Sequence, residues 1–333
     1  SSLEKLTKAV KLDAEFEAEK IAIEAKIHFI RAEDEAANKL RAKLTPDSPT
    51  NKILPRLTKP EGMSSLKSKE GHYIVYVDEE LKRRKGDVYA ARLLELIHAA
   101  YSKVFPFKTD PTVVHRCYIF SREYPYLEFC AGIGMDGRGA AGFFANETRI
   151  LIINADPRGD KTNRQGFTAD AVDTIFHEGF HQFIHNSVPD MPLWFNEGLA
   201  EYFGPSILVD ARKLRVGTFV REGKVYASRF ETIRQAINGE TLAPLPLRIF
   251  MRQSSREFMQ GGTRTSINYA QAWSLMHFLL HDPRVARQGR KVIRSYFKLL
   301  KGGATKDDAF RETFGKLNLD QLDKLWREYV LKL

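Results

Sequence analysis

The sequence contains only two cysteines, Cys117 and Cys130, among its 333 residues. Two thiols are too few for a disulfide-rich scaffold, and also too few for a zinc site built from three or four thiolates. They can form one disulfide bond or remain as two buried thiols, and both states stay open at this point. The sequence also lacks any run of about 18 apolar residues, which excludes an ordinary transmembrane helix within it.

Positive charge is abundant but unevenly distributed. The formal net charge is +10, and the net charges of residues 1–45, 46–204 and 205–333 are 0, −2 and +12. A diffuse excess without glycine-rich arms, zinc knuckles or an aromatic RNA-binding segment is a weak signal for nucleic acid. We therefore expect no nucleic-acid partner, and we expect residues 205–333 to favour an anionic surface or an acidic substrate.

The N-terminal part differs in composition from the rest. Residues 1–45 are free of glycine and proline and repeat apolar side chains at loosely helical spacing, which predicts one long, charged, amphipathic helix. Residues 46–70 contain four prolines and several serines, which is typical of a linker. The helix is therefore expected to be an appendage that either packs on the main domain or pairs with another chain.

The main domain is expected to cover residues 71–333. β-Branched and aromatic residues predict strands at 72–77 and 112–120 and a hairpin over 142–154, whereas the later sequence has mostly helical periodicity. The pattern divides the domain into an α/β part, a pair of helices with metal-ligating residues and a basic helical part (71–167, 168–204 and 205–333). A small mixed sheet followed by helices predicts an α+β fold.

One segment, His177-Glu178-Gly179-Phe180-His181, forms an H-E-x-x-H motif. Positions i and i+4 lie on one face of a helix, so both imidazoles can reach one zinc ion. Glu178 lies about 100° round the helix from His177, which places its carboxylate beside the metal, where a general base for a metal-bound water belongs. The other faces of the helix are apolar, and burial of these polar groups is unfavourable unless they are paired or bound to metal.

A second apolar segment carries two carboxylates, Glu197 and Glu201, within the sequence N-E-G-L-A-E-Y-F. Their i, i+4 spacing places them on one helix face. One carboxylate can complete a site of two histidines and one glutamate, which leaves the fourth coordination position for water. The other can accept the free ring N–H of a ligand histidine. The spacing alone leaves both assignments open.

Together, the H-E-x-x-H motif and the N-E-G-L-A-E-Y-F segment resemble the gluzincin clan of zinc metallopeptidases, most closely the peptidase-MA-like group of bacterial metallopeptidases. The similarity covers residues 71–331. It implies a zincin-like fold in which His177, His181 and Glu197 bind Zn²⁺ and Glu178 is the general base. It also implies that Glu201 accepts a hydrogen bond from His177.

Gluzincins commonly supply a tyrosine or histidine downstream of the third ligand to stabilise the developing oxyanion. The resemblance makes Tyr269 the candidate for this role. The alternative is that Tyr269 is an aromatic residue that only packs in a buried helix. Tyr202 is expected to point away from the metal, and His277 and His281 are expected to be ordinary helix residues.

The resemblance implies zinc-dependent hydrolysis of peptide bonds, with a peptide or protein substrate held along an edge strand at 142–145 or 149–154. The alternative is a catalytically degenerate zinc-binding domain that binds a partner or a surface. The presence of Glu178 favours the enzyme, because a purely structural zinc site needs no base. The resemblance and the missing initial methionine lead us to expect a periplasmic or secreted protein, whereas the sequence predicts no oligomeric state.

Overall fold

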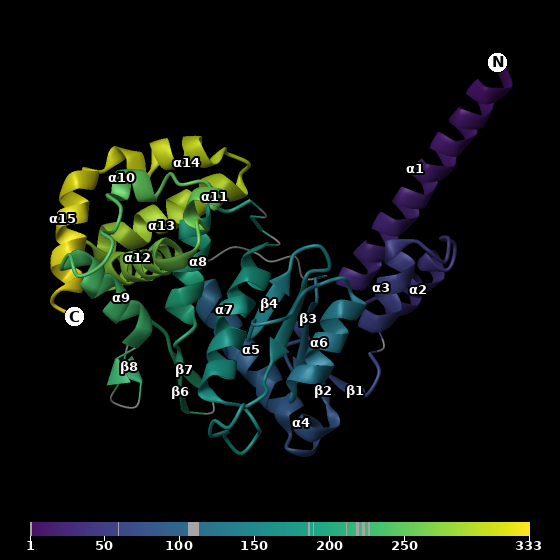
Figure 1. Cartoon of the computed structure of the whole chain (residues 1–333), viewed down its shortest axis with the longest axis horizontal. Helices are drawn as coiled ribbons and strands as arrows, with labels where there is room; N and C mark the ends of the chain where they lie inside the picture. Colours follow the sequence, from purple (N-terminus) through teal and green to yellow (C-terminus); the bar gives the residue numbers. More distant parts are fainter. Residues whose placement is uncertain are drawn as a thin grey trace. The chain divides into compact units, whose positions relative to one another are not determined.

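The computed structural model describes residues 2–58, 60–105, 113–185, 187–188, 190–210, 212–217, 220–221, 224–225 and 227–333. The chain forms two compact units (Figure 1). The first consists of Ser1–Glu95 and Thr109–Ala171, and the second of Leu96–Lys108 and Val172–Leu333. The first unit contains a mixed sheet and the second is mainly helical, so the prediction of an α+β fold is confirmed.

The sheet of the first unit has five strands in the order β1-β2-β3-β5-β4. Their bounds are β1 (Met63–Lys67), β2 (Tyr73–Asp78), β3 (His115–Phe120), β4 (Gly142–Ala145) and β5 (Ile150–Asn154). The three central strands, β2, β3 and β5, are parallel, and β1 and β4 are antiparallel edge strands. The central strands read as nearly continuous apolar runs because both of their faces are buried.

The structure corrects one expectation for these strands and leaves the start of another strand outside the described residues. The expected substrate-binding edge at 149–154 is wrong, because β5 pairs with β3 on one side and β4 on the other. Of the two candidate segments, β4 lies at an edge of the sheet. Thr112, at the start of the strand expected over 112–120, lies outside the described residues.

The N-terminal segment forms three helices, α1 (Ser2–Ile30), α2 (Asp34–Arg41) and α3 (Pro49–Thr58). The prediction of one long helix is wrong because Ala32 adopts a positive φ of 59°, a left-handed conformation that ends a helix. The prediction of a linker over 46–70 is also wrong, since this segment holds α3 and β1. Pro49 occupies the first position of α3, where its missing N–H leaves no helical hydrogen bond unmade.

These helices pack on one face of the sheet. Phe29, Leu54 and Leu57 share a buried core with Tyr76 and Tyr118. Packing on the sheet therefore applies to α2, α3 and the C-terminal part of α1, whereas residues 14–20 of α1 are exposed. Pairing of α1 with another chain stays a prediction.

A buried cation connects the helices to the sheet. The guanidinium of Arg116 in β3 lies 4.2 Å from the ring centroid of Phe29 and donates hydrogen bonds to the Tyr76 hydroxyl and the Asp34 carboxylate. Burial of an unpaired cation is strongly unfavourable, and these contacts compensate for it.

The first unit also contains α4 (Glu79–Arg83) and α6 (Glu123–Gly132), and α5 (Gly86–Val104) runs from the first unit into the second. Cys117 and Cys130 are both buried free thiols. Burial raises the pKa of Cys117 well above its ordinary value and that of Cys130 to about 11, so both thiols stay protonated.

The second unit contains the remaining elements: α7 (Ala169–His185), α8 (Leu193–Phe203), β6 (Ile207–Asp210), β7 (Lys213–Arg215), β8 (Val220–Arg221), β9 (Lys224–Val225), α9 (Ala227–Ile237), α10 (Leu247–Phe250), α11 (Ser255–Phe258), α12 (Gly262–His281), α13 (Ala286–Lys301), α14 (Lys306–Glu312), η1 (Phe314–Lys316) and α15 (Leu319–Val330). The first three residues of α7 belong to the first unit and the rest of this helix to the second. Over the residues with assigned positions, no helix combines the length and apolar content that crossing a bilayer requires.

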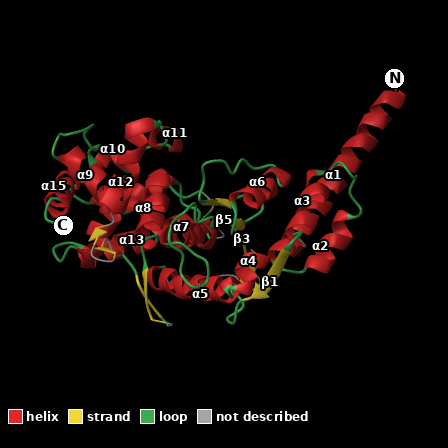
Figure 2. Cartoon of the chain, turned by 60° about the horizontal axis from the view of Figure 1, so that its bottom comes forward, coloured by secondary structure: helices red, strands yellow, loops and turns green. Residues whose placement is uncertain are grey.

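Helices α7 and α8 are held rigidly within the second unit. The ring of Tyr101 packs against Phe180 of α7 and Phe203 of α8, and its hydroxyl donates to the carbonyl of Phe176. Helix α8 lies beside α12 (Figure 1 and Figure 2). A Cβ on Gly198 would lie 2.7 Å from the Ala272 carbonyl oxygen, so glycine is needed for this close approach.

Candidate metal centre

Helix α7 begins at a defined cap and buries most of its surface. The Thr168 hydroxyl accepts a hydrogen bond of 3.0 Å from the Ala171 N–H, which satisfies one of the free donors of the first turn. Ile175, Phe176 and Phe180 are fully buried. The remaining face carries His177 and His181 one turn apart, with their ring centroids 4.9 Å from each other.

Three donor atoms converge beside this face. The Nε2 atoms of His177 and His181 are 3.2 Å apart, and the two carboxylate oxygens of Glu197 in α8 lie 3.5 and 3.7 Å from them, respectively. Ligand atoms about 2.0–2.1 Å from a tetrahedral zinc ion are separated by about 3.4 Å. The cluster of His177, His181 and Glu197 therefore has the dimensions to hold a metal ion.

The two candidate carboxylates have different partners. Glu197 faces the imidazoles and belongs to the metal-sized cluster. Glu201, one turn further along α8, accepts a hydrogen bond of 2.6 Å from Nη2 of Arg229 in α9. The Glu201 side chain is only 4% exposed, so its carboxylate is sheltered from water, whereas Arg229 is 28% exposed. The structure thus favours Glu197 as the third ligand, and a hydrogen bond between Glu201 and His177 stays a prediction.

The electrostatic environment favours a cation between these side chains. Burial lowers the pKa of His177, but the hydrogen bond to Glu197 and the negative charges of Glu178 and Glu201 outweigh it and raise this pKa to about 9. Burial also opposes ionisation of Glu197, yet the imidazoles of His181 and His177 hold its pKa below the ordinary value. Carboxylates that stabilise a positive charge at this point also favour a bound metal cation.

A neighbouring amide orients one of the imidazoles. His181 Nδ1 lies 3.1 Å from Oδ1 of Asn196 and donates a hydrogen bond to it. The lone pair of Nε2 is therefore left for the centre, because only one ring nitrogen of a neutral imidazole carries a proton. Sequence reasoning missed this role, although Asn196 directly precedes Glu197.

Glu178 lies next to the donor cluster without belonging to it. Its Oε1 atom is 3.9 Å from Nε2 of His177, and its side chain is 17% exposed. The carboxylate is therefore close to His177 and accessible to water, and its role as general base stays a prediction.

Tyr269 is half-buried in the second turn of α12. The guanidinium of Arg229 lies 4.9 Å from its ring centroid. Burial, followed by the charges of Glu197 and Glu201, raises the pKa of Tyr269 well above its ordinary value, so its hydroxyl stays protonated. This hydroxyl donates a hydrogen bond of 3.8 Å to Sδ of Met259. Arg229 thus contacts both Glu201 and Tyr269. No sequence signal marked it, because it lies on a separate helix outside the motifs.

Tyr202, His277 and His281 belong to a different group. The hydroxyl of Tyr202 lies 2.9 Å from Nε2 of His281. His277 donates from Nε2 to the Gly217 carbonyl at 3.2 Å and accepts at Nδ1 from the Tyr329 hydroxyl at 2.7 Å. These bonds link α8, α12 and α15, which agrees with a structural role for the two histidines.

Fold and site together define a protein whose mainly helical unit buries a centre of two histidines and one glutamate that could bind metal. Residues 171–298 match the family described as "Protein of unknown function (DUF1570)". The match includes the helices that carry the three donors and extends into α13, but it spans less than half of the chain. No curated protein matches the chain.

Proposed function

We propose that the second unit is a gluzincin-type zinc metallopeptidase that hydrolyses peptide or protein substrates. The observation that carries this proposal is the position of Glu178, which lies beside three convergent donors and outside the donor set. Two imidazole nitrogens and one carboxylate leave the fourth position of a tetrahedral zinc open, as in catalytic zinc sites. A structural zinc site uses four protein ligands and needs no adjacent base.

The residues have distinct roles in this mechanism. His177, His181 and Glu197 would hold the metal, which when bound supplies Lewis-acid chemistry that lowers the pKa of water and polarises a carbonyl. Glu178 accepts the proton of the attacking water and delivers it to the leaving amine. Tyr269 donates a hydrogen bond to the oxygen that becomes negative.

The test combines metal analysis with hydrolysis of a mixed peptide library. We expect one zinc per chain and peptide cleavage for the natural sequence. Glu178→Gln should keep the zinc and lower kcat by about 10²–10⁴-fold, because only proton transfer is lost. His181→Ala should lose both zinc and cleavage. His185→Ala, one turn further along α7, is the matched control and should keep both.

Two results would contradict the proposal in different ways. Stoichiometric zinc with no cleavage of any peptide would leave a metal-binding module that acts through a partner or a surface. Absence of zinc from the natural sequence, with metal content unchanged by His181→Ala, would show that the cluster does not bind metal at all.

The substrate class and the location belong to the same proposal. The net charge of +12 in residues 205–333 supports a preference for acidic peptides. The resemblance to extracytoplasmic metallopeptidases supports action in the periplasm or outside the cell. Comparison of acidic and basic peptides of equal length at low and high salt tests the first point, since charge preference weakens with ionic strength.

A further inference from the structure

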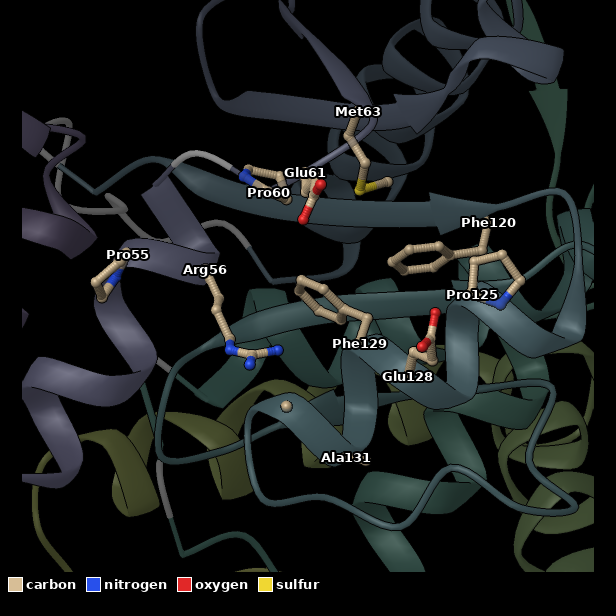
Figure 3. Close-up of a pocket in the computed structure, with 11 residues that line it drawn as sticks. Pro55, Arg56, Pro60, Glu61, Met63, Phe120, Pro125, Glu128, Phe129 and Ala131 are labelled. Carbon is tan, nitrogen blue, oxygen red and sulfur yellow. The ribbon is translucent and has the colours of Figure 1, made fainter.

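The first unit contains a cavity of about 820 Å³ between α3, the start of β1 and α6 (Figure 3). Sites that hold drug-sized ligands have volumes of about 300–1,000 Å³. Met63 and the rings of Phe120 and Phe129 give the cavity an apolar lining. None of its lining residues belongs to the candidate metal centre.

Charges of both signs reach the cavity. Arg56 comes from α3, Glu61 precedes β1 and Glu128 comes from α6. Throughout the described part of the chain, Arg56 and Glu61 have no hydrogen-bond or ion-pair partner. Glu128 accepts one hydrogen bond of 3.1 Å, from the hydroxyl of Tyr124. All three residues are exposed, so the cavity presents a hydrated cation and hydrated carboxylates that are not neutralised by one another.

The guanidinium of Arg56 lies at the C-terminal end of α6. A Cβ on Gly132 would collide with the guanidinium of Arg56, so the absence of a side chain lets Arg56 lie against the last residue of α6. The C-terminal end of a helix carries partial negative charge and favours a cation there. Figure 3 shows Arg56 on the α3 side, with Glu61 and Glu128 approaching the rings of Phe129 and Phe120 from above and below.

We propose that this cavity binds a short peptide with free termini. Its α-amine binds Glu61 and Glu128, its carboxylate binds Arg56, and an apolar side chain packs on Phe120 and Phe129. Arginine pairs well with a planar carboxylate, and aromatic faces accept both apolar groups and cations. A zwitterion with an apolar body complements both the charges and the lining. The proposal does not depend on metal binding or on peptidase activity.

Isothermal titration calorimetry can test this with a defined probe, the tripeptide alanyl-phenylalanyl-alanine. The full chain carrying Glu178→Gln is used, so that the peptide stays intact. We expect the tripeptide with free termini to bind, and its N-acetylated and C-amidated forms to bind about tenfold more weakly, because each loses one charge-assisted contact.

Matched variants assign the two ends of the peptide. Replacement of both Glu61→Gln and Glu128→Gln should weaken binding of the free peptide about tenfold and leave the N-acetylated form unaffected. Arg56→Gln should likewise weaken binding of the free peptide about tenfold, because the contact to the peptide carboxylate is lost, and should leave binding of the C-amidated form unaffected. Gly132→Ala displaces the guanidinium without removing its charge and should reproduce Arg56→Gln. Thermal unfolding verifies that each variant is folded, and Arg56→Gln alone decides if Gly132→Ala does not fold.

Three results would overturn the proposal. These are no heat from the free peptide, equal binding of free and blocked peptides, and loss of binding in His181→Ala, which would move the peptide to the metal centre. Failure of the proposed peptidase function gives a different result, namely absence of zinc or cleavage with unchanged peptide binding.

Discussion

The two units bury polar groups in different ways. In the first unit, Arg116 points the N–H donors of Nη1 and Nη2 at the acceptors of Tyr76 and Asp34, so these donors are paired within its own chain. In the second unit, His177, His181 and Glu197 direct acceptor atoms at one point. Acceptors that face each other repel unless a proton or a cation lies between them.

This difference separates a structural polar group from a binding one. Donors matched with acceptors stabilise a fold and need nothing further. Convergent nitrogen and carboxylate donors need a cation or a proton between them, and the pKa of about 9 means that His177 holds a proton there when no cation is bound. The following predictions test whether the two groups behave in these two ways.

Metal should stabilise the second unit by the largest amount. At a free zinc concentration of about 1,000 times Kd, binding to the folded state alone adds about 4 kcal/mol to the free energy of unfolding. Urea unfolding with zinc and with chelator measures this difference. His181→Ala should abolish it, whereas Arg116→Met should retain it. Equal zinc stabilisation in His181→Ala would show that the metal binds elsewhere.

Acid should destabilise the second unit through His277. Burial, followed by the charge of His281, lowers the pKa of His277 to about 4. An unfolded histidine titrates near pH 6.5, so below that pH the unfolded chain binds a proton that the folded chain does not. The contribution of His277 to the free energy of unfolding is therefore complete above pH 6.5. It falls by about 3 kcal/mol as the pH drops to 4.

The measurement uses urea unfolding across this pH range in a His181→Ala background with chelator, so that metal loss adds nothing to the slope. His277→Gln should flatten the dependence. The same slope with and without His277 would contradict the assignment.

Patterns carried by a single helix could be predicted from the sequence. The i, i+4 spacing places His177 and His181 on one face through helix geometry alone, and the buried helices follow from their apolar periodicity. The order of a sheet part and then helices also gave the fold class, because consecutive elements usually pack together.

Features that depend on long-range contacts could not be predicted. The break at Ala32 lies in a sequence with high helix propensity, and Asp34, two residues after it, pairs with Arg116 of β3. Pro49 and Pro55 suggested a linker, but Pro49 is the first residue of α3, where proline is tolerated, and Pro55 lies inside the same helix. Arg229 reaches Glu201 from a helix 28 residues later in the chain.

Loss of the Arg116 contacts should lower the free energy of unfolding by less than metal removal does. Arg116→Met removes the contacts to Tyr76 and Asp34 and should lower the free energy of unfolding by about 2 kcal/mol, a value reduced because Asp34 is partly exposed and can be hydrated. The double variant with Asp34→Asn should lose less than the sum of the single variants, because the two residues share one interaction. Zinc content should not change. A loss of zinc in Arg116→Met would show that the two groups are coupled.

The smallest expected effect concerns Arg229, which lies in the second unit together with the candidate metal centre. Arg229 pairs with Glu201 and lies over Tyr269, so Arg229→Met should disturb the orientation of Tyr269 while leaving the three metal ligands in place. We expect kcat for peptide hydrolysis to fall about tenfold with KM and zinc content unchanged, because an oriented donor acts mainly on the transition state. In a Tyr269→Phe background the same substitution should have no further effect. Loss of zinc in Arg229→Met would instead show that Arg229 holds the metal ligands in place, which is a structural role like that of Arg116.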